Sequence, residues 1–309
     1  MRSIVPALLT VSCLLGTRSD ADADSLNDLL GPREIAVGEA MRGSATGASA
    51  IGLNPAGLPL NRELVFEGGY GWRGTDDASL ISVSACDSTN AAPGCFFYDY
   101  IGTNPELVGM TGTRTTHVGG MALSRLLLPR VMVGATVKYF NFKSDMAGEM
   151  AQSGFVADFG ATLRLTQMIN LGLSGQNLYA SEDKHPMFPR AVGGGFHARP
   201  MPNLALGFDA RWLLDAEQVS DSMRYGGGAE LFLSGQRGQT GYPIRAGALR
   251  DNGLGCTYVS GGLGMATLKW SVDLAARRQV KGGDETMVIA SLRFWGPREA
   301  SPGLDSMGD

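Results

Sequence analysis

The sequence predicts an all-β protein: a transmembrane antiparallel β-barrel of about 12–14 strands with a small N-terminal helical or irregular hatch. Three observations favour this fold class. Apolar and polar residues alternate with a period of two in many segments, these segments are long for strands, and the N-terminus has the pattern of an export signal. Glycine is abundant, with 44 of 309 residues, which disfavours a helix-rich protein because glycine weakens helix interiors.

The N-terminal residues predict a cleaved signal peptide over 1–23. Arg2 is followed by a short apolar run from Ile4 to Leu15, and Ala21-Asp22-Ala23 is a small-x-small cleavage pattern. A lipoprotein signal that ends at Cys13 is the alternative. Export of the chain is therefore expected.

The segment 24–62 precedes the first expected strand and differs from the rest of the chain. From Gly31 to Leu60 it is rich in small residues and only weakly helical, and it contains Asn54-Pro55-Ala56-Gly57-Leu58. Asn-Pro is a turn signal, since proline fixes φ. These residues alone predict a loop or a cap.

The barrel is expected over 63–295, followed by a polar tail over 296–309. The clearest alternation starts at Val131, Phe155, Leu204 and Leu268. Each segment has the nine to eleven residues that a tilted strand needs to cross a bilayer. A soluble sandwich with its apolar faces turned inward would also alternate. The region from Ala85 to Thr116 does not alternate clearly and is expected to hold one strand with long flanking loops.

Charged residues of both signs fall on the polar face of these segments, where a barrel lumen would lie. They are Lys138, Asp158, Arg164, Asp209, Arg211, Glu230, Lys269, Asp273, Arg277 and Arg293. The main expectation is a mutually paired network that holds the barrel and the hatch, with Arg33, Glu34, Glu39 and Arg42 of the hatch as further partners. The alternative is a path for an ion or a substrate.

Cys86 and Cys95 lie on either side of a turn-rich stretch and are expected to form a disulfide in an oxidising compartment. The alternative is two unpaired small residues. Cys256 lies in a strand pattern and has no evident partner.

No pattern in the sequence indicates an enzyme or a cofactor. His117, His185 and His197 show no pair at zinc-ligand spacing, and no metal site is expected. The glycine clusters lie in strand patterns and lack the Lys-Ser/Thr of a P-loop, so they are expected where the barrel bends or the hatch approaches. The net charge of −4 gives no basic footprint for nucleic acid.

The hatch segment resembles the N-terminal hatch of the FadL-type and PorV-like outer-membrane barrels. In those families a Gly/Ala-rich stretch leads into Asn-Pro-Ala-Gly-Leu and then the first strand, as Asn54 to Leu58 do here. Gln176-Asn177-Leu178, Pro189-Arg190 and the run from Pro243 to Gly247 are similar to the PorV-like branch. The resemblance implies about fourteen strands, a lumen closed by the hatch, and the outer membrane of a Gram-negative bacterium.

The resemblance leaves two functions open. The first expectation is a PorV-like component of a secretion, motility or surface-attachment apparatus, with protein partners in the periplasm or at the cell surface. The alternative is a FadL-like, hatch-gated passive transporter of hydrophobic small molecules such as long-chain fatty acids. Outer-membrane lipid surrounds the barrel in both cases. An apolar lumen near the hatch would favour transport, and a packed, charged lumen would favour the structural role.

Overall fold

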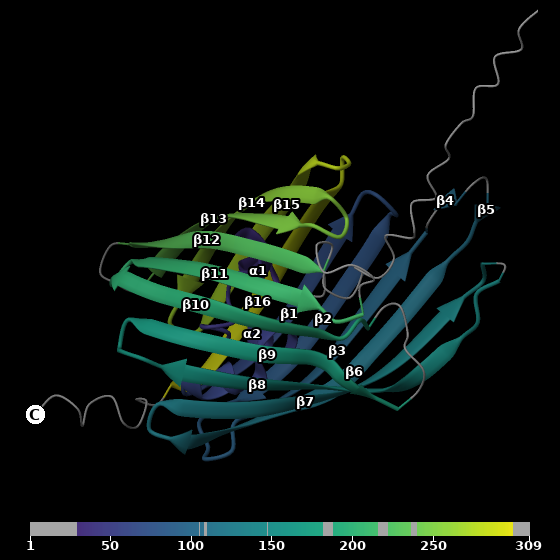
Figure 1. The fold of residues 1–309 in the computed structure, drawn as a ribbon. Coiled ribbons are helices and arrows are strands. Elements are labelled where there is room, and N and C mark those ends of the chain that lie inside the picture. Colours follow the sequence, from purple (N-terminus) through teal and green to yellow (C-terminus); the bar gives the residue numbers. More distant parts are fainter. Residues whose placement is uncertain are drawn as a thin grey trace, which may run out of the picture.

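The computed structural model describes residues 30–104, 106–107, 110–146, 148–181, 188–215, 222–235 and 240–298. The predicted signal peptide and residues 299–309 of the predicted tail lie outside these ranges. The described chain forms a closed antiparallel barrel in which β1 pairs with both β2 and β16 (Figure 1). A closed wall satisfies every strand edge, so no row of backbone donors and acceptors is left open to lipid.

Fourteen strands form the wall, in agreement with the predicted fold class. They are β1 (Glu63–Arg73), β2 (Ala78–Asp87), β3 (Gly94–Thr103), β6 (Arg114–Leu128), β7 (Val131–Ser144), β8 (Gln152–Arg164), β9 (Ile169–Ala180), β10 (Ala191–Met201), β11 (Leu204–Leu213), β12 (Met223–Ser234), β13 (Thr240–Asp251), β14 (Cys256–Thr267), β15 (Trp270–Lys281) and β16 (Thr286–Arg298). The short β4 (Glu106–Leu107) and β5 (Met110–Thr111) pair with each other outside the wall.

The two ends of the barrel differ in their connections. The end that holds the start of β1 and the finish of β16 has tight turns at 129–130, 202–203 and 268–269, and we call it the short-turn end. The opposite end, which we call the loop end, has longer connections such as 181–190 and 214–222.

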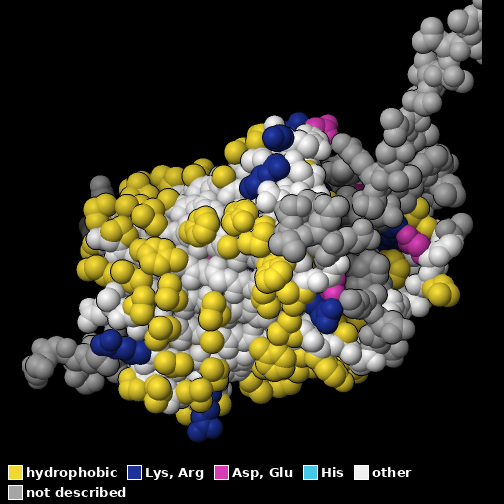
Figure 2. Space-filling model, viewed as in Figure 1, with side chains coloured by type: hydrophobic (Ala, Val, Ile, Leu, Met, Phe, Trp, Pro, Cys, Tyr) yellow, Lys and Arg dark blue, Asp and Glu magenta, His cyan; other side chains and the backbone are white. Residues whose placement is uncertain are grey.

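Apolar side chains are spread over the face of the wall that Figure 2 shows. Phe66, Phe159, Leu173, Leu263 and Phe294 are each at least half exposed. Such a surface is unfavourable in water but matches the hydrocarbon of a bilayer. The apolar faces therefore do not meet inside a soluble sandwich, which excludes that alternative for the described chain.

Aromatic residues lie on this outer surface near both ends of the strands, as Tyr70 and Trp72 do near the loop end. Such rings suit the boundary between lipid and water. Trp295, near the end of β16, instead packs against the interior core. In the described ranges, no helix has both the length and the apolar character that spanning a bilayer would require.

The hatch lies inside the barrel (Figure 1) and consists of three short helices. These are α1 (Pro32–Ala36), α2 (Ala48–Leu53) and the 3₁₀ helix η2 (Pro55–Leu60). Proline at the first turn suits α1 and η2, where an N–H would lack a partner in any case. The Asn54 side chain caps η2 by accepting a hydrogen bond from the Ala56 N–H at 3.2 Å.

Candidate functional site: the hatch and the lumen

The hatch backbone lies directly against one arc of the wall. A Cβ atom built on Gly207 would lie 2.1 Å from the Ala40 carbonyl oxygen, and one on Gly226 would lie 1.9 Å from the Gly38 oxygen. Only glycine allows this approach. At comparable positions on consecutive strands from β7 to β14, an added Cβ would meet backbone or side-chain atoms of the hatch, and we call these positions the glycine belt: Gly134, Gly160, Gly172, Gly195, Gly207, Gly226, Gly228, Gly247 and Gly262.

Asn54 joins the hatch to β8. Its side-chain amide donates to the Ala161 carbonyl at 3.3 Å and to the Thr162 hydroxyl at 2.9 Å. The same amide donates to the Arg42 carbonyl at 2.9 Å, so Asn54 also ties two parts of the hatch together. The side chain is fully buried, and a buried amide left without partners would be costly. The remaining motif residues, Pro55 to Leu58, form the start of η2 and are also buried.

Arg42 is the main charged link between the hatch and the wall. Its guanidinium lies 3.0 Å from the Asp209 carboxylate on β11. It also donates to Ser174 at 3.1 Å and to Gln176 at 3.4 Å on β9, and its backbone N–H donates to Asp209 at 3.0 Å. Gln176 in turn donates to the Gly52 carbonyl of α2 at 2.6 Å. This set fixes the centre of the hatch to two strands.

Glu39 forms a second charged link, towards the other side of the barrel. Its carboxylate lies 2.9 Å from the Arg224 guanidinium and 3.6 Å from that of Arg277. Arg277 also pairs with Glu285 at 2.8 Å, and its guanidinium lies over the Tyr258 ring at 4.7 Å. Glu39 has a positive φ of 63°, which turns the chain sharply between its contacts with β12 and β11.

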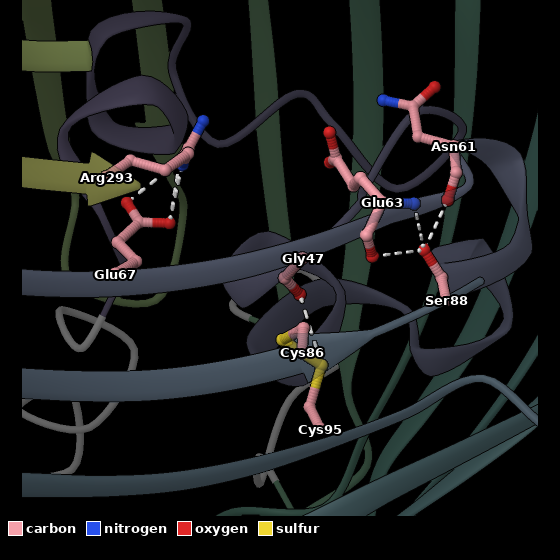
Figure 3. The surroundings of a disulfide bond; sticks show 8 residues. All are labelled: Gly47, Asn61, Glu63, Glu67, Cys86, Ser88, Cys95 and Arg293. Atoms are coloured by element: carbon pink, nitrogen blue, oxygen red, sulfur yellow. Dashed lines mark hydrogen bonds and ion pairs between the residues drawn. A yellow bond between two sulfur atoms is a disulfide. The ribbon is translucent and has the colours of Figure 1, made fainter. Parts of the chain in front are cut away.

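Glu34 is buried in the hatch beside the Glu67–Arg293 pair of the wall, whose charged atoms are 2.7 Å apart (Figure 3). The Ser49 hydroxyl donates to the Glu34 carboxylate. Burial raises the pKa of Glu34 above its ordinary value, and the Arg33 charge opposes this shift. α1 lies within the lumen, and Glu34 is close to the charges of Glu67 and Arg293 on the wall. The protonation state of Glu34 therefore affects the contact between the hatch and the wall.

A disulfide joins Cys86 and Cys95, which face each other across β2 and β3 (Figure 3). Both cysteines are buried, and Cys95 lies 3.9 Å from the Gly47 carbonyl oxygen of the hatch. Nearby, the Ser88 hydroxyl accepts from the Glu63 N–H at 3.0 Å and donates to the Asn61 carbonyl at 2.5 Å. These contacts fix the chain where it passes from the hatch into β1. Cys256 is buried and free.

Most of the charges predicted for the lumen face the interior and form pairs. Lys138 lies 2.7 Å from Asp158, and Arg245, which the sequence analysis did not single out, lies 2.5 Å from both Glu230 and Asp273. Asp209, Arg211, Arg277 and Arg293 are also buried. Lys269 differs from the expectation: β14 ends at Thr267, so Lys269 lies exposed in the turn 268–269.

A bulge interrupts the pairing of β8 and β9. Phe159 pairs with Gly175 and Ala157 pairs with Tyr179, so several residues of β9 lie opposite Asp158 alone. Asn177 occupies the bulge with a φ of 53°. Its N–H donates to Asp158 at 2.7 Å, and its side-chain oxygen accepts from Lys138 at 2.9 Å. The charged pair therefore stabilises an irregular segment of the wall.

The lumen is apolar on the side opposite the charged links. Inward-facing residues near the loop end of β2, β3, β6, β7, β8 and β16 form one cluster with the hatch residues Leu30, Ile51 and Leu53. On the wall these are Leu80, Phe97, Ile101, Val118, Phe140, Phe142, Val156, Met287 and Ile289. Phe188, from the loop 181–190, covers this cluster and packs on Phe140 with ring centroids 4.4 Å apart.

The hatch separates cavities on its two sides. A cavity of about 100 Å³ on the side of the loop end is lined by Ile51, Leu53, Phe97, Val118 and Phe188 among others. Two larger cavities, of about 570 Å³ and about 430 Å³, open towards the short-turn end and have polar walls. Within the described ranges no group of His, Cys, Asp and Glu could hold a metal ion.

No family profile matches the sequence, and no curated protein matches it. Solved structures do share the fold. The CymD monoaromatic hydrocarbon channel has a TM-score of 0.65 at 10% identity, over 88% of this chain and 98% of that one. The Pseudomonas putida toluene transporter TodX has a TM-score of 0.64 at 12% identity, over 86% and 97%. A Pseudomonas aeruginosa FadL homologue has a TM-score of 0.58 at 13% identity, over 86% and 97%.

The chain thus has the fold of the FadL-type outer-membrane channels. The first functional expectation, a PorV-like component of a secretion, motility or surface-attachment apparatus, is wrong. The structures that share this architecture are transport channels, and the lumen beside the hatch is apolar. The sequence pattern indicates the lumenal charges but not this apolar side, because inward-facing apolar residues cannot be told from lipid-facing ones by residue type.

Proposed function

We propose that the protein is a hatch-gated, non-enzymatic channel for hydrophobic small molecules in the outer membrane of a Gram-negative bacterium. The observation that carries this proposal is the apolar lumenal cluster that runs from the loop end to the hatch. The names of the similar structures, a monoaromatic hydrocarbon channel and a toluene transporter, support the same class of ligand.

The proposal also fixes the orientation of the barrel. Short turns face the periplasm and longer loops face the outside in bacterial outer-membrane barrels. The apolar cluster under Phe188 then receives a hydrophobic molecule from outside, and the hatch separates it from the polar cavities on the periplasmic side. The proposal also includes export by a signal peptide over 1–23, a hatch over 24–62 and a polar periplasmic tail. Because β16 extends to Arg298, residues 296–298 of the predicted tail 296–309 belong to the wall.

Burial of apolar surface supplies the free energy with which a hydrophobic ligand binds in the lumen. A hydrophobic ligand gains about 25 cal/mol per Å² of apolar surface removed from water, and the phenylalanine rings of the lumen supply that environment. Passage to the periplasm then requires the hatch to move, because its backbone closes the lumen against the glycine belt. The ion pairs of Arg42 and Glu39 oppose that movement.

Uptake in a strain that lacks the chromosomal copy tests the proposal. Cells complemented with the wild-type protein should take up low concentrations of radiolabelled toluene or a radiolabelled long-chain fatty acid faster than cells without it. Phe97→Gln, which places an amide in the apolar cluster, should reduce uptake, whereas the matched Phe97→Leu should retain most of it. Equal uptake by all strains, with each barrel shown to be assembled by its heat-modifiable gel mobility, would refute transport of these molecules.

A further inference from the structure

The two cavities at the short-turn end adjoin each other and share part of their lining. Both contact Arg33 and Thr46 of the hatch, Arg199 of β10 and Glu230 of β12. We call the joint space the arginine vestibule, because six arginines line it: Arg33, Arg62, Arg164, Arg199, Arg245 and Arg293. It lies on the opposite side of the hatch from the apolar cluster, so it is distinct from the proposed path of the hydrophobic ligand.

Among the residues that the structure describes, three acidic ones line the vestibule, and two of these are already paired. Glu230 and Asp273 both pair with Arg245 at 2.5 Å, and the third is Glu63. Arg293 pairs with Glu67 of the wall. By contrast the side chains of Arg33, Arg164 and Arg199 form neither a hydrogen bond nor an ion pair in the part of the chain that the structure describes, although the charges of Arg33 and Arg199 lie near enough to Glu230 to favour its carboxylate.

These three guanidinium groups converge from different elements. Arg164 of β8 pairs in register with Asn170 of β9, and Asn170 pairs with His197 of β10. Arg199 lies two residues further along β10 and lines the same cavity as Arg164. Neighbouring strands are about 4.8 Å apart, so β8 and β10, with β9 between them, are about 10 Å apart, a distance that two long arginine side chains can span. Arg33 faces this space from α1.

The His197 ring also borders this cavity, but its Nδ1 atom is buried away from the open space. The three arginines face that space, and like charges around one cavity repel each other. A bound anion with several oxygen atoms would relieve this repulsion.

We infer that the arginine vestibule binds a compact oxyanion with at least two negative charges, held between Arg33 of the hatch and Arg164 and Arg199 of the wall. Guanidinium groups bind such oxyanions through paired, charge-assisted hydrogen bonds. Phosphate, sulfate and small dicarboxylates share this chemistry. The anion is a water-soluble solute, since the site faces the aqueous lumen. Because Arg33 moves with the hatch while Arg164 and Arg199 do not, the bound anion holds the hatch closed.

Calorimetric titration of the folded protein in a non-ionic detergent tests binding. Inorganic phosphate, sulfate and succinate are titrated separately at constant ionic strength, with chloride as the reference anion. At least one of the three should bind saturably and chloride should not. Arg199→Gln and Arg164→Gln should each weaken binding about tenfold, since each removes a charge-assisted pair. Lys269→Gln, at the same end but outside the cavity, should leave the affinity unchanged.

Conductance in planar bilayers tests whether the bound anion links Arg33 of the hatch to the wall and so holds the hatch closed. The anion that binds should lower the open probability of the wild-type channel, and Arg33→Gln should abolish this effect while the wall arginines still bind the anion more weakly. Absence of saturable binding by the wild type, or equal binding by the Arg164→Gln/Arg199→Gln double variant, would overturn the site. An equal drop in open probability in Arg33→Gln would overturn the bridge. Neither experiment depends on transport of a hydrophobic molecule, so a failure here is distinguishable from a failure of the proposed function.

Discussion

Replacing Arg42 by methionine should release the hatch. Methionine keeps much of the length of the arginine side chain but removes the charge, so Asp209 stays buried without its partner. Both side chains are only 3% exposed, and removal of one member of a buried pair costs about 3–5 kcal/mol. The hydrogen bonds from Arg42 to Ser174 and Gln176 are lost as well.

This cost falls mainly on the closed position of the hatch, because Arg42 belongs to the hatch and Asp209 to the wall. At about 1.4 kcal/mol per factor of ten, the ratio of closed to open channels should fall by about a hundredfold to a few thousandfold. Single-channel recording in planar bilayers measures this ratio directly. A long-lived open state, rare in the wild type, should become common in Arg42→Met.

Two further variants separate the loss of the Arg42–Asp209 ion pair from other effects of the substitution. Asp209→Asn added to Arg42→Met should restore part of the closed population, because it removes the uncompensated buried charge. Arg190→Met breaks another arginine–aspartate pair, with Asp215 at 2.7 Å, which is partly exposed and lies in loops away from the hatch. Wild-type gating in Arg42→Met, or the same opening in Arg190→Met, would refute the role assigned to Arg42.

Three more predictions concern the closed state. Gly226→Val should open the channel, because even its Cβ would lie 1.9 Å from a hatch carbonyl oxygen, whereas Gly194→Val, whose Cβ would lie 3.4 Å from the nearest side chain, should not; conductance compares the two. Phe188→Ala should speed uptake of hydrophobic molecules at low concentration, because it uncovers the apolar cluster; slower uptake in cells with an assembled barrel would contradict this. Burial raises the pKa of Glu34, so its contribution to hatch docking is fully present at low pH and lost as pH rises through the raised pKa; Glu34→Gln should flatten that part of the pH dependence of open probability, and an unchanged profile would argue against it.

The strands that the sequence predicted best have one apolar and one polar face. In β7 the outward residues from Val131 to Tyr139 alternate with Thr136 and Lys138, which face the lumen. Alternation fails in β3, where Phe96 and Tyr98 face outward but Phe97 and Ile101 face an apolar lumen. A strand with apolar residues on both faces shows no alternation with a period of two. The strand boundaries between Ala85 and Thr116 therefore could not be predicted from the sequence pattern.

The hatch motif was visible in the sequence, but its partners were not. Asn54 bonds to residues more than a hundred positions away, and pairing of Arg42 with Asp209 spans 167 positions. The wall carries several charged residues of the right sign for each charged residue of the hatch. The register of the strands in the closed wall decides which of them forms the pair. Arg33 and Arg164 were expected to join a paired network, whereas the structure leaves them facing an open cavity together with Arg199, which the sequence pattern did not indicate.

The glycine belt shows that contact with lipid and contact with the hatch constrain different positions of the barrel sequence. A bilayer constrains the side chains that point outward, yet these glycines point inward and their substitution would leave every strand ladder intact. Variation at these positions should therefore be limited by the fit of the inner segment alone. Substitutions in the glycine belt are therefore the way to engineer a permanently open pore. Substitutions meant to stabilise the wall should leave the glycine belt unchanged.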